Sequence, residues 1–276
     1  MRIRRPGARA AHARNLYIEL LIRALTHTLY EGVDRVEMPV PAEVREEFRE
    51  ALRGTDEAAL IFDHEGSRAQ GRDWPRYAQT MVGLERLRNV RRCVERVLSD
   101  RVPGDFIEAG VWRGGVAILI RGILRAYRVG ERRVWLADSF RGLPPPDPDR
   151  HPADSGSRAH EHELLAVSAD QVRDNFRRYD LLDDQVVLVA GWFRDTLPAL
   201  GDRRWALIRL DGDMYESTMD SLVNLYDGLE RGGFLIVDDF ALTPCREAVE
   251  DFRRERGIDE PIERIDWTGV YWRKRG

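Results

Sequence analysis

The sequence has 276 residues, of which 43% are hydrophobic and 33% charged, and its formal net charge is −4. This length suits one large α/β domain with additions, and the apolar content excludes disorder over most of the chain. The small acidic excess excludes a global basic field for nucleic acid, and no apolar run approaches the roughly 18 residues of a membrane helix. We therefore expect neither a nucleic-acid partner nor a membrane partner.

Cysteine usage and the N-terminus indicate the compartment. Cys93 and Cys245 are too few for a disulfide framework or a cysteine metal site. The basic start MRIRRPGARAAHARN is not followed by the apolar core of a secretion signal. We interpret it as a solvated tail, with a nucleic-acid arm or a transit peptide as alternatives. These features predict a cytoplasmic protein.

Residues 1–100 are predicted to form an N-terminal helical extension. Leucines recur at helical spacing from Leu16 to Leu25, and apolar residues do the same from Val82 to Val97. The polar stretch 53–76 contains three glycines and no clear period, so a loop or mobile arm is expected there. The apolar helix Leu16–Leu29 suggests an interface, and a homo-oligomer is expected.

Residues 101–276 alternate between short apolar runs and helical patterns. Strands are expected at 105–111, 133–137, 185–190, 205–210 and 234–237, with two short segments around Gly269. Four helices are expected. The first covers 114–128, and the second begins after a Ser168/Gln171 capping box. The third carries Met219 and ends at the glycines at 232–233, and the fourth runs from Thr243 to Gly257. This alternation predicts an α/β fold with a mostly parallel, doubly wound sheet. In such sheets the ligand lies at the carboxyl ends of the strands.

The first of these strand ends carries the motif Glu108-Ala-Gly110-Val-Trp-Arg-Gly114-Gly115. Its glycines lie where a strand turns into a helix, so backbone can approach a ligand closely. The spacing is not the G-x-G-x-x-G of a dinucleotide site. Glu108 suits a ligand with an ammonium group, such as the methionyl end of S-adenosylmethionine. The alternative is a tight turn with an exposed glutamate.

The next strand ends suit the nucleoside part of such a ligand. Asp138, followed by Ser139, can accept hydrogen bonds from ribose hydroxyls, although an aspartate that only starts a turn is the alternative. Gly191 and Trp192 allow backbone contact and an aromatic wall for adenine, but a lone tryptophan is more often core. Met81 is a candidate cofactor contact, with a core or loop anchor as the alternative.

Carboxylates close the two remaining strands, where Asp211 and Asp213 follow one and Asp238 and Asp239 follow the other. Carboxylates that converge at one sheet edge repel unless a cation lies between them. Oxygen-only ligation favours Mg²⁺ or Ca²⁺ over zinc. Acidic loop ends facing water are the alternative.

The Pro-rich loop 142–167 contains three histidines and is predicted to be a lid. Its histidines lack the spacing of a zinc site. They are interpreted as solvent-facing, with His160 or His162 touching substrate as the alternative.

Several segments closely resemble the macrocin O-methyltransferase family over residues 73–274. They are DWPRYAQTMVGLERLRNVRRCVE, PGDFIEAGVWRGGVAILIRGILRAY, VWLADSFRGLPPPD, LLDDQVVLVAGWFRDTLP, RLDGDMYESTMDSL, GGFLIVDDF and AVEDFRRERGIDEPIERIDWTGVYWRK. The resemblance implies a Rossmann-like class I methyltransferase fold that uses S-adenosylmethionine and Mg²⁺. It implies an acceptor that is a sugar hydroxyl of a glycosylated small molecule in antibiotic biosynthesis.

By position, the resemblance assigns Glu108 and Gly110 to the methionyl group, Asp138 and Ser139 to ribose and adenine, and Gly191 and Trp192 to the adenine pocket. It assigns Asp211, Asp238 and Asp239 to the metal. Asp213 shares the motif but is the weaker candidate, because we expect it to point away from Asp211 in an extended chain.

The expected mechanism is Mg²⁺-assisted methyl transfer to one of two neighbouring hydroxyls, with Asp211 as base and His160 or His162 as second choice. A nicotinamide oxidoreductase and a non-catalytic member of the same fold are the alternatives.

Overall fold

The computed structural model describes residues 7–30, 46, 49–50 and 67–276. The N-terminal helix α1 (Ala8–Leu25) begins earlier and ends earlier than the predicted helix Leu16–Leu29. Most of the predicted loop 53–76 lies outside the described residues. Within the described part of this segment, residues 67–70 form the short helix α3 (Ser67–Gln70).

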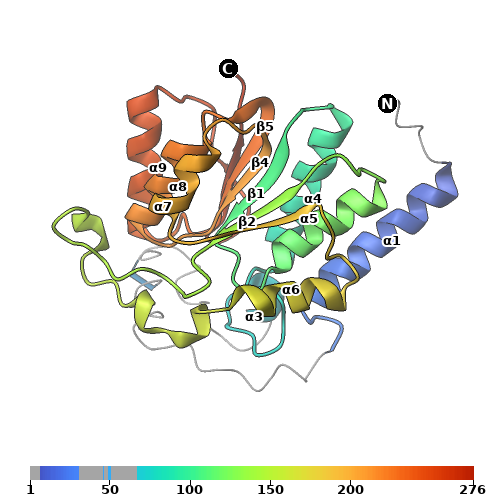
Figure 1. The fold of residues 1–276 in the computed structure, drawn as a ribbon, viewed down its shortest axis with the longest axis horizontal. Helices are drawn as coiled ribbons and strands as arrows, with labels where there is room; N and C mark the ends of the chain where they lie inside the picture. The colour runs from blue at the N-terminus through green and yellow to red at the C-terminus, as the bar shows by residue number, and fades with distance from the viewer. Residues whose placement is uncertain (1–6, 31–45, 47–48, 51–66) are drawn as a thin grey trace.

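One seven-stranded sheet organises the chain (Figure 1). Its strands are β1 (Asp105–Ala109), β2 (Val134–Asp138), β3 (Val186–Ala190), β4 (Trp205–Leu210), β5 (Leu229–Val237), β6 (Glu263–Arg264) and β7 (Val270–Arg273). The strand order is β3-β2-β1-β4-β5-β7-β6, and only the pairings of β7 are antiparallel. The predicted mostly parallel sheet, including the two short segments around Gly269, is confirmed.

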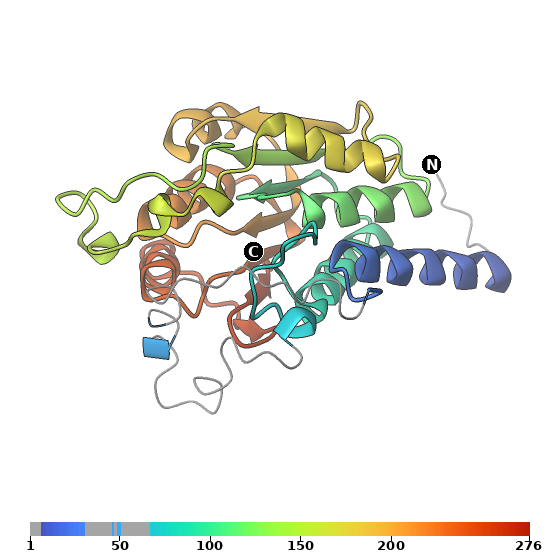
Figure 2. The same cartoon turned by 90° about the horizontal axis from the view of Figure 1, so that it is seen from below.

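Helices cover both faces of the sheet, as Figures 1 and 2 show. One core contains Phe106 of β1 and packs against α1, α4 (Leu84–Ser99), α5 (Gly115–Ala126) and α6 (Ala169–Arg178). The other contains Ile107 and packs against α8 (Tyr215–Leu225) and α9 (Thr243–Arg256). Successive strand residues thus face opposite cores, as the pleat of a two-sided sheet requires. Among the described helices, none combines the length and apolar character needed to cross a bilayer.

Several predicted boundaries were wrong, among them the end of β1, which lies at Ala109 rather than at residue 111. The helix expected to reach residues 232–233 ends at Leu225, and β5 begins at Leu229 rather than at residue 234. Leu229 is buried in the same core as α8, although it belongs to β5 and pairs with Trp205. Its apolar side chain therefore matched the helical spacing, and the helix was predicted to continue too far. The helix predicted from Thr243 to Gly257 is α9, which begins at Thr243 and ends at Arg256.

The predicted lid, 142–167, contains three short 3-10 helices rather than extended chain. They are Pro152–Asp154, Ala159–Glu161 and Glu163–Leu165. The capping interaction predicted just beyond it is confirmed, because Ser168 Oγ accepts the N–H of Gln171 at 3.2 Å at the start of α6.

Candidate active site

A pocket of about 210 Å³ lies where the carboxyl ends of β1, β2, β4 and β5 meet the lid and the N-terminal extension. The extension contributes Trp74, Met81 and Arg86 to its wall. The predicted candidates that line the pocket are Met81, Glu108, Gly110, Asp138, Ser139, His162, Trp192, Asp211, Asp238 and Asp239. Gly191 and His160 are not part of this lining.

Glu108 is a buried acid with one oxygen that lacks a side-chain partner. It is 1% exposed, which overturns the alternative of an exposed glutamate, and its Oε1 pairs with Arg209 Nη1 at 2.6 Å. Its buried Oε2 has no hydrogen-bond partner among the described side chains, although the backbone N–H of Ala117 stabilises the carboxylate. Burial raises the pKa of Glu108 to about 8. An ammonium group in the pocket would satisfy this oxygen and favour the ionised form, so the site fits the methionyl end of the cofactor.

Gly110 allows the turn beside Glu108. Its φ is +87°, and a Cβ placed there would lie 1.7 Å from the carbonyl oxygen of Asp211. Only glycine fits this position, because both the left-handed backbone and the close approach of the next strand exclude a side chain.

Asp138 is held by the backbone around it. Its Oδ2 accepts the N–H of Val111 at 2.8 Å, and its Oδ1 accepts the N–H of Phe140 at 2.7 Å. Burial raises the pKa of Asp138, while these N–H groups act in the opposite direction. Ser139 donates its hydroxyl to the carbonyl of Gly142 at 2.6 Å. The second lone pair of each Asp138 oxygen can still accept from a ribose hydroxyl.

Trp192 stands on the pocket wall and is half-buried, outside both apolar cores. It precedes the short helix α7 (Phe193–Thr196). Gly191, just before it, has a φ of +146°, and a Cβ there would lie 2.6 Å from Thr196 Cγ2. The glycine therefore serves the turn, and Trp192 supplies the wall that an adenine ring could contact.

Three carboxylates converge at the ends of β4 and β5. One oxygen each of Asp211, Asp213 and Asp239 lies within 4.8 Å of the others. The expectation that Asp213 points away was wrong, because its φ of +55° turns the chain back and its N–H donates to Asp239 Oδ2 at 3.3 Å. Burial, and then the charges of Asp213 and Asp211, raise the pKa of Asp239. This oxygen-only donor set fits a hard divalent cation.

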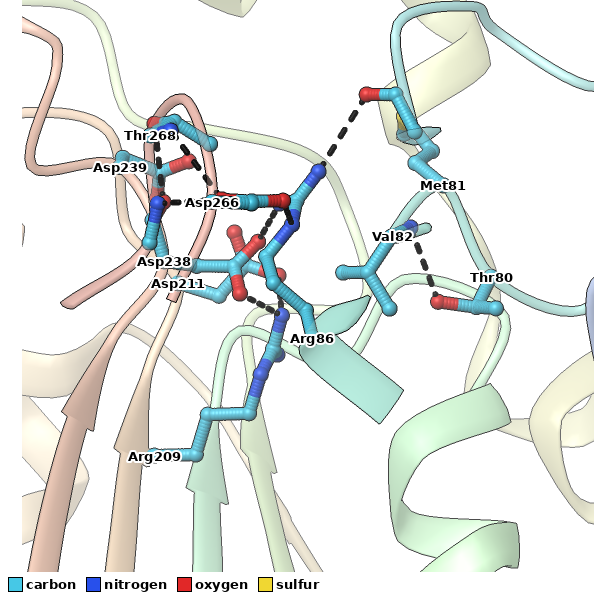
Figure 3. Close-up of polar contacts among 12 residues, drawn as sticks. Thr80, Met81, Val82, Arg86, Arg209, Asp211, Asp238, Asp239, Asp266 and Thr268 are labelled. Carbon is cyan, nitrogen blue, oxygen red and sulfur yellow. Dashed lines mark hydrogen bonds and ion pairs between the residues drawn. The ribbon is translucent and has the colours of Figure 1, made fainter. Parts of the chain in front are cut away.

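Asp238 is not one of these three carboxylates, although it lies beside Asp211, and it is engaged by two arginines (Figure 3). Arg86 Nη1 contacts its Oδ2, and Arg209 Nη2 lies 2.7 Å from its Oδ1. Although burial acts to raise the pKa of Asp238, Arg209 and Arg86 hold it below the usual range. In this arrangement Asp238 is the counter-ion of the two guanidinium groups.

Arg209 and Arg86 are the site residues that sequence reasoning missed. Arg209, in β4 and 1% exposed, also lies 2.9 Å from Asp211 Oδ2. Arg86, in α4, reaches Asp266 at 2.9 Å and the carbonyl of Gly71 at 3.2 Å. A signal was available for each. Arg209 interrupts an otherwise apolar strand, and Arg86 falls on the buried face of its helix, where an unpaired charge would be costly.

The two candidate histidines of the lid differ in position. His160 is exposed, whereas His162 is half-buried, lines the pocket and meets the ring of Trp74 edge-on at 5.5 Å. His162 Nε2 is buried with no hydrogen-bond partner in the described part of the chain. Met81 reaches the pocket from the extension, and its carbonyl accepts from Arg68 at 2.6 Å.

Comparison with known proteins identifies close relatives. A family profile described as macrocin-O-methyltransferase (TylF) matches residues 14–274. The chain is 50% identical over 265 residues to the 8-demethyl-8-(2,3-dimethoxy-alpha-L-rhamnosyl)-tetracenomycin-C 4′-O-methyltransferase of Streptomyces olivaceus, with 95% of this chain and 93% of that protein covered. It is 44% identical to the mycinamicin III 3″-O-methyltransferase of Micromonospora griseorubida, with 94% and 96% covered.

Solved structures agree with these relatives. The O-methyltransferase NovP superposes with a TM-score of 0.82 at 44% identity, covering 95% of this chain and 100% of that one. CalS11, a calicheamicin methyltransferase, superposes with a TM-score of 0.56 at 19% identity, covering 87% and 96%, and supports the fold alone. The predicted methyltransferase fold is confirmed.

Proposed function

Because the chain belongs to the macrocin-O-methyltransferase family, we propose that it transfers a methyl group from S-adenosylmethionine to a sugar hydroxyl of a glycosylated natural product. The predicted enzyme class, an S-adenosylmethionine-dependent O-methyltransferase, is confirmed, and the nicotinamide alternative is set aside. The family match, which spans residues 14–274, carries the proposal, and the pocket supports it. Two of the relatives are named as O-methyltransferases of tetracenomycin and mycinamicin compounds.

The cofactor would be held by residues from three strand ends. Glu108 would bind its ammonium group, Asp138 with Ser139 its ribose, and Trp192 its adenine, while Gly110 and Gly191 allow the turns. Met81 would contact it from the extension. The cofactor supplies a methyl group on a positively charged sulfur, which is already an activated electrophile.

Asp211 and Asp239 would hold Mg²⁺, since both belong to the predicted ligand set and to the cluster in the structure. The third ligand predicted from sequence is Asp238, but the carboxylate that completes the cluster is Asp213. The ion would supply acidification and positioning of a bound hydroxyl. Binding it would also relieve the repulsion among the carboxylates.

The chain's own base is proposed to be Asp211. Burial raises the pKa of Asp211, whereas Arg209 acts in the opposite direction. Because a metal-bound carboxylate is a weak base, the ion would contribute much of the acidification of the hydroxyl. Arg209 holds one of its oxygens at 2.9 Å and so fixes the orientation of the carboxylate. His162, which faces the same pocket from the lid, is the second candidate for this proton, and His160 is further away on the surface.

The charge of the pocket favours an uncharged glycoside over a sugar nucleotide. Its described lining holds three arginines, Arg86, Arg194 and Arg209, and ten carboxylates: Asp73, Glu108, Asp138, Asp154, Asp211, Asp213, Glu216, Asp220, Asp238 and Asp239. A diphosphate would enter a site whose described carboxylates outnumber its arginines and offer no matching cluster of cationic side chains, although a bound Mg²⁺ would reduce this repulsion. Methylation would thus follow glycosyl transfer.

The test is methylation with isotope-labelled S-adenosylmethionine and Mg²⁺. Three acceptor classes would be offered: glycosylated natural products, their aglycones, and the matching nucleoside-diphosphate sugars. We expect label on a sugar oxygen of a glycoside, located by NMR, and none on the aglycones or the sugar nucleotides. Faster methylation of a sugar nucleotide would overturn the acceptor class, and methylation of the aglycone would overturn the sugar hydroxyl.

We propose that the extension, residues 1–100, shapes the acceptor side, because Trp74, Met81 and Arg86 reach the pocket from it.

The homo-oligomer remains a prediction. Leu16 and Leu20 of α1, which are 59% and 56% exposed, are where its interface is expected. Light scattering of the protein and of a Leu16→Glu/Leu20→Glu variant would test it. A cytoplasmic location also remains a prediction.

A further inference from the structure

Asp154 is a buried acid in the middle of a polar loop. Its neighbours Ser155 and Gly156 are exposed, yet Asp154 itself is 0% exposed. Its Oδ1 accepts the N–H of Tyr215 at 2.6 Å, and its Oδ2 accepts the N–H of Glu216 at 3.0 Å. Both of its carboxylate oxygens are therefore engaged by backbone of another element.

Those two N–H groups belong to the first turn of α8, an 11-residue helix. The residue at its N-cap position, Met214, has no side chain that can cap it. The first N–H groups of a helix have no partner within the helix, so they need an acceptor from elsewhere. Asp154 provides it from the lid, 61 residues earlier in the chain. Its negative charge also complements the positive end of the helix dipole.

The first turn of α8 adjoins the other parts of the site. It follows the carboxylate loop directly, with Asp213 two residues before Tyr215. Glu216 in this turn pairs with Arg194 of α7 at 3.0 Å, close to the proposed adenine wall. A contact here fixes the lid relative to residues proposed for metal and cofactor.

The anchoring contacts of the lid are distributed along it. Near its start Ser139 bonds the carbonyl of Gly142, and near its end Trp112 Nε1 donates to the carbonyl of Leu164 at 2.9 Å. Asp154 holds the middle, and the ring of His151 lies 5.7 Å from that of Tyr215. Three residues that follow Asp154 line the pocket, namely Ser157, Ala159 and His162.

We propose that Asp154 is a positioning residue that fixes the lid over the acceptor side of the pocket by capping α8. This role in acceptor binding rests on the proposed function, whereas the anchoring of the lid does not. Loss of the cap would release residues 155–162 and weaken acceptor binding, while the cofactor residues on β1 and β2 would keep their places. The proposal therefore predicts weaker binding of the acceptor and unchanged binding of the cofactor.

The experiment compares Asp154→Leu, Asp154→Asn and the matched control Asp149→Asn, a change at an exposed position of the same loop. Three quantities are measured on the full chain: acceptor KM and kcat, the Kd of S-adenosylhomocysteine, and the rate of trypsin cleavage after exposed Arg158. Losing a helix cap corresponds to about a 3- to 30-fold change in an equilibrium. We expect Asp154→Leu to raise acceptor KM and the cleavage rate within that range.

The Kd of S-adenosylhomocysteine should stay within about 3-fold of the wild-type value. For Asp154→Asn, acceptor KM and the cleavage rate should lie between those of the wild type and Asp154→Leu, because the amide oxygen can still accept one N–H. The control should behave as wild type. Unchanged cleavage and KM in Asp154→Leu would overturn the proposal, as would an equal loss of cofactor and acceptor affinity. If no glycoside is methylated by the wild type, the proposed function fails, while cleavage at Arg158 still decides the anchoring.

Discussion

Replacing Arg86 by methionine should destabilise the protein more than any ordinary surface change. The side chain is 6% exposed and joins the N-terminal extension to the sheet. It contacts Asp238 at the end of β5 and lies 2.9 Å from Asp266, before β7. Methionine keeps the length and apolar character of the side chain but removes its charge and its donors. The buried carboxylate of Asp238 and the partly buried carboxylate of Asp266 would each lose a partner.

The magnitude follows from what those carboxylates retain. Removing one partner of a buried ion pair costs about 3–5 kcal/mol. Asp238 would keep Arg209 at 2.7 Å, and Asp266 would keep the N–H groups of Thr268 and Gly269 at 3.1 and 2.8 Å. We therefore expect Arg86→Met to lower the free energy of unfolding by the lower end of this range, about 3 kcal/mol. At about 2–4 °C per kcal/mol for a chain of this size, the melting temperature should fall by about 6–12 °C.

The assay is thermal unfolding followed by calorimetry, with Arg88→Met as control on the same helix. Arg88 pairs with Glu19 at 2.9 Å and is 36% exposed, so its loss should cost no more than about 1 kcal/mol. Adding Asp238→Asn to Arg86→Met should recover part of the loss, because it removes the charge left unpaired. Equal shifts for Arg86→Met and Arg88→Met would refute this account of the network.

Two further changes test the ligand sites. Burial raises the pKa of Glu108 to about 8, and an ammonium ligand needs the ionised carboxylate, so S-adenosylhomocysteine should bind more tightly as pH rises from about 6 to about 8. Calorimetry of Glu108→Gln should show weaker S-adenosylhomocysteine binding that does not change with pH. Wild-type affinity that is the same at about pH 6 and about pH 8 would contradict the assignment of Glu108 to the ammonium group. Asp213→Asn should weaken Mn²⁺ binding, measured by electron paramagnetic resonance, about 10-fold or more, whereas Asp238→Asn should have a smaller effect. The reverse order would make Asp238 the third ligand.

Local patterns predicted the frame of the site. The strand-end positions of Glu108 and Asp138 follow from apolar runs broken by acids and glycines, and both residues line the pocket. The sheet brings them together because carboxyl ends of parallel strands share one edge. Gly110 could also be predicted, since a glycine between strand and helix indicates a backbone that other residues avoid.

Contacts between distant segments could not be predicted in this way. Arg86 meets Asp238 across 152 residues, and Asp154 meets Tyr215 across 61. Neither separation leaves a periodic trace in the sequence. Asp213 was misplaced because its positive φ is a property of one turn, and a non-glycine residue there gives no local warning. Arg86 and Asp213 determine which carboxylates pair with arginines and which form the cluster of three.

Removing the metal is the sharpest test of metal-assisted methyl transfer to a sugar hydroxyl. Enzyme treated with EDTA and then freed of it would be mixed with labelled S-adenosylmethionine and a glycoside bearing neighbouring hydroxyls, and Mg²⁺ would be titrated back. We predict a rate about 100-fold lower without metal, full recovery with Mg²⁺, and the label on a sugar oxygen. A full rate without divalent metal, or label elsewhere on the acceptor, would contradict the account.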